Sequence, residues 1–237
     1  MKKILIIGLW ASLAISCSSD STSNGNVTLK AVAVSSTGKT SLTSRVASTV
    51  VITDFKINIG NVKFETDEGD ERFKDDPSHE DIKLTGPFLL DLLNPDQTLS
   101  QIITSVTVPD AKYEEIKFKF EKSALTGEMF EKTFLIKGTV DGKEFVLWSG
   151  EEAELEMDFE DSNKDFIVNS SNITLFIKFR LDALLAKIAD LQSQGLLHDK
   201  DGDGVIEIST GDDDGHHDLG ELFKGLLENE THLDDKD

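Results

Sequence analysis

The sequence predicts a mainly β protein, in which an antiparallel β-sandwich over residues 27–180 precedes a small helix–loop–helix extension over residues 181–237. Roughly eight to ten short segments alternate apolar with polar residues, which is the pattern of strands that bury one face. Turn signals containing Gly, Pro, Asn or Asp separate these segments, and a helical period appears only after residue 180. These three observations favour a sandwich, with a closed barrel as the alternative arrangement.

Residues 1–16 have the features of a signal peptide. Two lysines precede an apolar run over residues 4–15. This run is shorter than the roughly 20 residues of a transmembrane helix and has the length of a signal-peptide core. It ends in the sequence LAISC (residues 13–17), which resembles the cleavage box of a bacterial lipoprotein signal. The resemblance implies cleavage before Cys17 and attachment of lipid to its sulfur, whereas a plain secretory signal followed by an unrelated cysteine is the alternative.

Cys17 is the only cysteine in the chain, and a single thiol in an exported protein needs an explanation that lipidation supplies. Residues 17–26 are small and polar, so they are expected to form a flexible tether. The sequence therefore predicts a membrane partner reached through lipid on Cys17. The expected location is the cell envelope, at the outer membrane, facing either the periplasm or the cell surface.

Charge narrows the choice of partners. The 237-residue chain has a formal net charge of −21, and loss of Lys2 and Lys3 with the signal makes it −23. Such a chain is not suited to nucleic acid, whose phosphates require a basic surface, or to lying flat on anionic lipid. It is suited to solubility and to cation binding. The hydrophobic content of 38% is enough for one domain with an appendage.

The first half of the predicted sandwich contains four strands. Alternating or continuous apolar positions place them at residues 27–33, 55–64, 87–93 and 102–108. In the second of these strands the apolar positions change parity between Ile59 and Val62, so a bulge or bend is expected at Gly60. Segments 35–44 and 66–81 are rich in small or acidic residues and are expected to be loops.

The second half contains five more predicted strands, at residues 113–121, 130–136, 145–148, 153–159 and 173–179. The dipeptide Asp141-Gly142 predicts a hairpin turn between the second and third of these. Trp148 is expected in the core. Four acids alternate with the apolar residues of the fourth strand: Glu152, Glu154, Glu156 and Asp158. They are interpreted as a solvated strand face, with a cation- or sugar-binding surface as the alternative.

Two amphipathic helices are predicted in the extension. The first has apolar residues at helical spacing at Leu181, Leu184, Leu185, Ile188 and Leu191, and it should end near Gly195. The second covers residues 218–227, with Asp218 and Glu221 at the spacing of an N-cap and its partner. Both helices are expected to pack on the sandwich or on each other, and residues 228–237 form an acidic tail.

The residues between the helices, HDKDGDGVIEI (198–208), resemble the calcium loops of EF-hand and dockerin-type modules. Gly204 stands where such a loop turns sharply, and Ile206 should point into the core. The predicted metal ligands are the carboxylates of Asp199, Asp201, Asp203 and Glu207 and the backbone carbonyl of Val205. The cofactor implied is Ca²⁺, and its expected role is structural: it would fix the connection between the helices.

The loop departs from the EF-hand pattern at its last position, where Thr210 replaces the usual bidentate acid. Asp212, Asp213 or Asp214 could fold back to complete the shell, and an acidic turn that binds no ion is the alternative. The neighbouring pair His216-His217 is a weaker candidate for a transition metal, because adjacent histidines rarely converge on one ion.

The sequence contains no nucleophile elbow, no zinc-protease HExxH motif, and no GxxxxGK or GxGxxG phosphate-binding motif, so nothing in it argues for an enzyme. The expected function is a binding or assembly module of the cell envelope, with an envelope protein or a glycan as its partner. A calcium-dependent hydrolase, or an accessory subunit of one, is the alternative.

The middle of the chain also resembles a bacterial family of lipid-anchored β-sandwich proteins of unknown function. The resemblance covers residues 27–179, and the matching stretches are FKINIGNVKF (55–64), GPFLLDLL (86–93), VPDAKYEEIKF (108–118) and ELEMDF (154–159). A turn with the pattern Pro-x-x-x-Tyr recurs in that family and corresponds here to Pro109 and Tyr113. The resemblance implies a sandwich in the cell envelope and brings no known activity.

Overall fold

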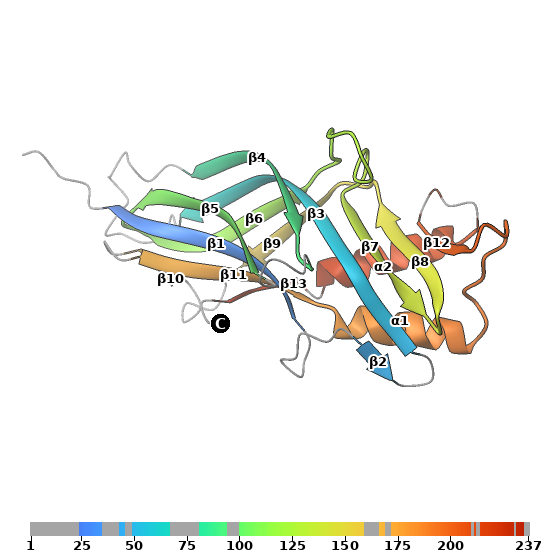
Figure 1. Ribbon diagram of the computed structural model, residues 1–237. Helices are drawn as coiled ribbons and strands as arrows, with labels where there is room; N and C mark the ends of the chain where they lie inside the picture. Colours follow the sequence, from blue (N-terminus) through green and yellow to red (C-terminus); the bar gives the residue numbers. More distant parts are fainter. Residues whose placement is uncertain are drawn as a thin grey trace, which may run out of the picture.

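The computed structural model describes residues 24–34, 43–45, 49–66, 81–93, 100–158, 166–168, 172–209, 211, 214–229 and 231–234. Within these residues the protein is mainly β, with two sheets and two helices (Figure 1). The predicted signal peptide, Cys17, residues 35–42 of the expected loop and most of the acidic segment 66–81 lie outside the described residues. The last two residues of the loop expected over residues 35–44 belong instead to a short strand, Thr43–Arg45.

The elements follow one another along the chain in the order β1 (Asn24–Val34), β2 (Thr43–Arg45), β3 (Thr49–Thr66), β4 (Ile82–Asp91), β5 (Ser100–Pro109), β6 (Lys112–Phe120), β7 (Phe134–Val140), β8 (Lys143–Ser149), β9 (Ala153–Asp158), β10 (Phe166–Ile167), β11 (Asn172–Arg180), α1 (Asp182–Ser193), β12 (Val205–Ile208), α2 (His217–Asn229) and β13 (Thr231–Asp234).

Strand β3 is the central strand of the larger sheet. The path through this sheet is β10-β6-β3-β7-β8-β12, and β2, β4 and β9 branch from it. On one side β3 pairs with β7 over residues 50–57 and then with β6 over residues 59–66. The smaller sheet has the order β13-β11-β1-β5. Among the described residues, both sheets are open and neither closes into a barrel.

Two strand pairings are parallel, and one of them lies within the sandwich that the sequence predicts as antiparallel. β1 pairs with β11 in parallel, and β12 pairs with β8 in parallel. A short hairpin forces neighbouring strands to run antiparallel, but these partners are separated by long stretches of chain that leave either direction possible. Alternating hydrophobicity indicates which face of a strand is buried and not which way its neighbour runs, so the antiparallel prediction is wrong for β1 and β11. β12 lies outside the predicted sandwich, and no pairing was predicted for it.

The bulge expected at Gly60 is confirmed. The register of β3 shifts between Ile59 and Asn61 against both β4 and β6. Because the bulge adds one residue, side chains on either side of it reach the same core in spite of their opposite parity. The side chains of β3 that are fully buried as a result include Phe55, Ile57, Ile59, Val62 and Phe64.

Two of the predicted turns have a clear physical basis. Asp141 and Gly142 both have positive φ, at 50° and 81°, which matches the right-handed twist of the β7–β8 hairpin. At the turn between β5 and β6, the buried Tyr113 donates a hydrogen bond from its hydroxyl to the carbonyl oxygen of Pro109, at 3.0 Å. This bond ties the tyrosine side chain to the backbone at the end of β5 and accounts for the position of Tyr113 in the turn.

Both helices lie on the larger sheet near β7, β8 and β12 (Figure 1). α1 buries the apolar face that the sequence predicts, and the chain leaves it at Gly195 with φ of +67°. α2 begins one residue earlier than expected. The carbonyl of His216 accepts the amides of Leu219 and Gly220, so His216 occupies the N-cap position predicted for Asp218. No helix among the described residues is both long and apolar enough to cross a membrane.

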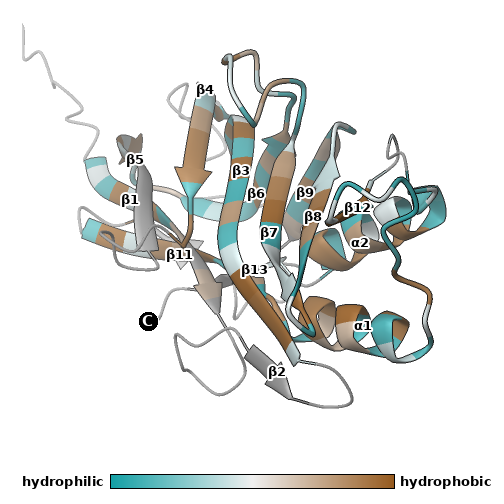
Figure 2. Ribbon diagram, turned by 45° about the vertical axis from the view of Figure 1, so that its right-hand side comes forward, coloured by the Kyte–Doolittle hydropathy of each residue, from teal (hydrophilic) through white to brown (hydrophobic). Residues whose placement is uncertain are grey.

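The segment between the helices contains a strand as well as a loop. β12 was not predicted, since four residues give too short a pattern, but Ile206 is buried as expected and Ile208 is buried with it. Figure 2 shows alternating hydrophilic and hydrophobic bands along β3 and on α1 and α2. The core is continuous and includes side chains from both sheets and both helices, such as Leu29, Phe118, Leu184 and Phe223.

Candidate metal site

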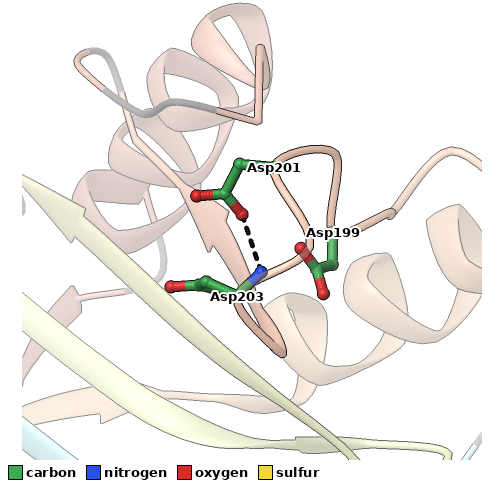
Figure 3. A group of neighbouring side chains, drawn as sticks. All are labelled: Asp199, Asp201 and Asp203. Atoms are coloured by element: carbon green, nitrogen blue, oxygen red, sulfur yellow. Dashed lines mark hydrogen bonds between the residues drawn. The ribbon is translucent and has the colours of Figure 1, made fainter.

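Three of the predicted ligands converge in the loop that joins α1 to β12. One carboxylate oxygen from each of Asp199, Asp201 and Asp203 lies within 4.8 Å of the other two (Figure 3). Asp201 and Asp203 are exposed, and Asp199 is half-buried. Among the described residues, this is the only group of three or more acidic, His or Cys side chains with the spacing to hold a metal ion.

The loop is shaped by two glycines and by the first aspartate. Gly202 and Gly204 have φ of +82° and +98°, a left-handed conformation that side-chain-bearing residues rarely adopt. Their amides donate to the two oxygens of Asp199, at 2.6 Å and 2.9 Å. The backbone therefore wraps around the Asp199 carboxylate and presents the next two aspartates beside it.

The second and third aspartates each accept an amide two residues further on. Asp201 accepts the amide of Asp203 at 3.1 Å, and Asp203 accepts the amide of Val205 at 2.8 Å. The hydrogen bond from Asp203 lowers the pKa of Asp201, but desolvation and the negative charges of its neighbours outweigh it, so that the pKa is raised. Negative charge is thus concentrated at this point of the surface, and a cation would relieve the repulsion.

The two remaining predicted ligands lie on β12. Val205 is its first residue, so its carbonyl follows directly after the three aspartates in the chain. The residue is half-buried. Glu207 is also half-buried, but its carboxylate is not part of the group of three. In calcium loops this ninth position often acts through a water molecule, so the direct protein ligands gathered here are the three aspartates.

Asp214 folds back onto the loop, as the sequence suggested for one of three aspartates. It is buried, with 2% of its surface exposed, and it accepts the amides of Lys200 at 2.6 Å, Asp201 at 3.4 Å and Glu207 at 2.8 Å. Burial raises the pKa of Asp214, but these three hydrogen bonds and the nearby His216 lower it more, so that it lies below its usual value. Thr210, Asp212 and Asp213 lie outside the described residues.

The histidine pair does not form a site of its own. His216 is buried and its Nδ1 lies 2.7 Å from the carbonyl oxygen of Glu207, whereas His217 is exposed in the first turn of α2. The ring of His216 instead meets that of His198, edge to face, with centroids 4.9 Å apart. The rings thus hold α2 against the loop.

Three of the four acids predicted to form a solvated strand face, Glu152 just before β9 and Glu154 and Glu156 within it, are exposed as expected. Glu152 lies 3.0 Å from Lys119, and Glu156 lies 3.4 Å from Lys117, both on β6. Trp148 differs from expectation because it is only half-buried, with the ammonium of Lys132 lying 5.0 Å from its ring centroid. Trp148 lies on the outer face of β8, whereas Phe145 and Leu147 lie on the buried face. An unbroken apolar run in the sequence does not show which of its residues face outward.

The loop lies at one end of the molecule, and the start of β1 lies at the other end (Figure 1). Comparison of the chain with models of protein families, with curated proteins and with solved structures found no significant match. The fold and the three converging aspartates are therefore the observations from which function is argued.

Proposed function

We propose that this chain is a lipid-anchored protein of the cell envelope that serves as a binding or assembly module and carries a structural calcium site at residues 199–207. In this proposal its two sheets form a β-sandwich. The observation that carries the calcium site is the convergence of Asp199, Asp201 and Asp203 on a tight, glycine-shaped loop.

Calcium is the ion that this chemistry favours. The donors are all oxygens, and Ca²⁺ takes six to eight oxygen ligands in a flexible shell, whereas Mg²⁺ demands strict octahedral geometry. Three carboxylates, the carbonyl of Val205 and water from the exposed side of the loop supply such a shell. A site this open belongs in the weak class of extracellular modules, with a dissociation constant on the order of 10⁻⁴ to 10⁻³ M.

The test is thermal unfolding of the mature protein with calcium and with chelator. An ion that binds only the folded state at about 100 times its dissociation constant stabilises that state by about 2.7 kcal/mol. We expect calcium to raise the midpoint and Asp203→Asn to remove the rise. Asp190→Asn, which removes one charge from an exposed position on α1, should leave it intact. An unchanged midpoint in the wild type would show that the loop is only an acidic turn.

The proposed anchor is tested separately. Lipid on Cys17 should place the protein in the membrane fraction, and Cys17→Ser should release it to the soluble fraction of the envelope. Protease treatment of intact cells then distinguishes the two faces of the outer membrane, because only a surface-displayed body is removed. Membrane association of Cys17→Ser equal to that of the wild type would contradict the anchor.

A glycan is the second candidate partner, and the position of Trp148 favours it. A half-buried aromatic ring on an outer strand face can stack on a sugar, unlike a core tryptophan. Glycan binding predicts that Trp148→Ala abolishes retention on an oligosaccharide array while the unfolding midpoint changes little. An array without any bound oligosaccharide would exclude this version of the module.

A further inference from the structure

The carboxylate of Asp214 accepts hydrogen bonds from a stretch of backbone that lies before it in the chain, and we call this contact the Asp214 brace. Its Oδ1 accepts the amide of Lys200, in the loop, and its Oδ2 accepts the amide of Glu207, in β12. One carboxylate therefore fixes the distance between the beginning of the aspartate loop and the strand in which that loop ends. Its own position is fixed, since it lies just before α2 and is almost fully buried.

The chemistry of this brace requires a carboxylate. Both oxygens receive N–H groups, so an amide side chain in the same place would direct its NH₂ group at a backbone donor. Hydrogen bonds to an ionised acceptor are shorter and about twice as strong as neutral ones. A buried carboxylate that receives such bonds is stabilised where it is, and the amides that it accepts are kept from water.

We propose that Asp214 is a positioning residue that holds loop 199–207 in the shape that gathers its three aspartates, without the help of an ion. In an EF-hand loop the acid at the twelfth position closes the loop by binding the metal itself. Here Thr210 stands at that position, and Asp214 closes the loop by binding its backbone. That the preformed shape serves calcium binding rests on the calcium site proposed above. The hydrogen bonds by which Asp214 holds the loop do not depend on that site.

The preformed loop has a consequence for ion binding. A site that must be ordered when the ion arrives loses affinity by the cost of that ordering. In the folded protein Asp214 has already ordered the loop, so this ordering does not lower the affinity for the ion. Removing Asp214 should therefore weaken calcium binding although it is not one of the three converging ligands.

The test is amide hydrogen exchange of the mature protein in chelator, read by NMR. In the wild type, the amides of Lys200 and Glu207 should exchange at least about tenfold more slowly than that of Asp203, whose acceptor is exposed. Asp214→Asn should remove this protection, and Asp203→Asn should leave it unchanged. Asp190→Asn is the control for the loss of one charge.

Calcium titration of the same proteins supplies the second measurement, in which Asp214→Asn should raise the dissociation constant about tenfold. Slow exchange at Lys200 and Glu207 that persists in Asp214→Asn would overturn the inference, as would fast exchange at both in the wild type. The wild-type comparison remains decisive if the variant does not fold. If the wild type binds no calcium, the proposed function fails, and the exchange in chelator alone decides whether Asp214 braces the loop.

Discussion

Gly138, in β7, occupies a place where the neighbouring strands leave no room for a side chain. A Cβ atom there would lie 2.0 Å from the carbonyl oxygen of Val51 and 2.8 Å from the ring of Phe145. The carbonyl belongs to the backbone of β3, close to a further register shift of that strand, between Ile52 and Asp54. Neither neighbour can turn aside, because β3 is fixed by its ladders and Phe145 is buried in the core.

We therefore expect Gly138→Ala to lower the free energy of unfolding by about 3 kcal/mol, at the upper end of the usual cost of overpacking. Gly225→Ala is the matched control, since a Cβ at Gly225, within α2, meets nothing within 4 Å. Alanine favours a helix over glycine, so the control should raise stability by about 0.5 to 1 kcal/mol. Urea unfolding measures both variants, and equal stability of Gly138→Ala and the wild type would contradict the close approach.

Paired strands place two acids opposite each other on the outer face of the larger sheet. Glu65 of β3 and Glu115 of β6 are register partners, with 19% and 15% of their side chains exposed. The ammonium of Lys117 lies 3.4 Å from Glu65 and 3.3 Å from Glu115. Burial and the hydrogen bond with Glu65 raise the pKa of Glu115 to about 7, whereas the hydrogen bond with Lys63 is the main cause that lowers the pKa of Glu65.

The raised pKa of Glu115 predicts a pH dependence of stability. An unfolded glutamate titrates near 4.3, so between about pH 4.5 and 7 the folded state holds a proton that the unfolded state has released. The free energy of unfolding should then fall as pH rises through this range, and Glu115→Gln should remove about 1 to 2 kcal/mol of that fall. The lowered pKa of Glu65 acts in the opposite sense and only below about pH 4.5.

Urea unfolding at intervals from pH 5 to 8 measures the slope. Glu154→Gln, at an exposed position on β9, is the control for the loss of a carboxylate from the same face. If the free energies of unfolding of Glu115→Gln and the wild type change in parallel over this range, the pKa of Glu115 is not raised in the folded state.

At the scale of the whole molecule, the sequence predicts local features better than it predicts how distant segments meet. The bulge at Gly60, the Asp141-Gly142 hairpin, the buried faces of β3 and β6 and both helices follow from periodicity and turn chemistry, which act over a few residues. The parallel pairings and β12 do not, because the partners of these strands lie far away in the chain.

The same limit applies to the candidate site. The spacing of Asp199, Asp201 and Asp203 follows from a local loop pattern, and the structure brings the three together. The part played by Asp214 depends on where α2 returns to the loop, and the sequence offered it only as one of three adjacent aspartates. The position of Trp148 also depends on a global feature, namely which side of β8 faces the core.

Long-range packing makes a prediction about the last 57 residues, which follow the predicted sandwich boundary at residue 180. This segment supplies β12 to the larger sheet and β13 to the smaller one, and its helices contribute Leu185, Ile188, Phe223 and Leu227 to the common core. Each fully buried side chain of this kind contributes roughly 1.5 to 3 kcal/mol, while a whole domain is stable by only about 5 to 15 kcal/mol. We therefore expect the chain to lose its fold when it is cut at residue 180.

The protein without residues 1–16 should accordingly unfold in one cooperative transition. Trp148, the only tryptophan outside residues 1–16, lies on β8 beside β12, so its fluorescence reports on the edge that the C-terminal segment covers. Far-ultraviolet circular dichroism reports on the strands of both sheets. The two midpoints should coincide in urea, because the segment and the sheets share one core. Two separated transitions, or a cooperative transition in a chain that ends at residue 180, would show instead that the sheets and the C-terminal segment are independent folding units.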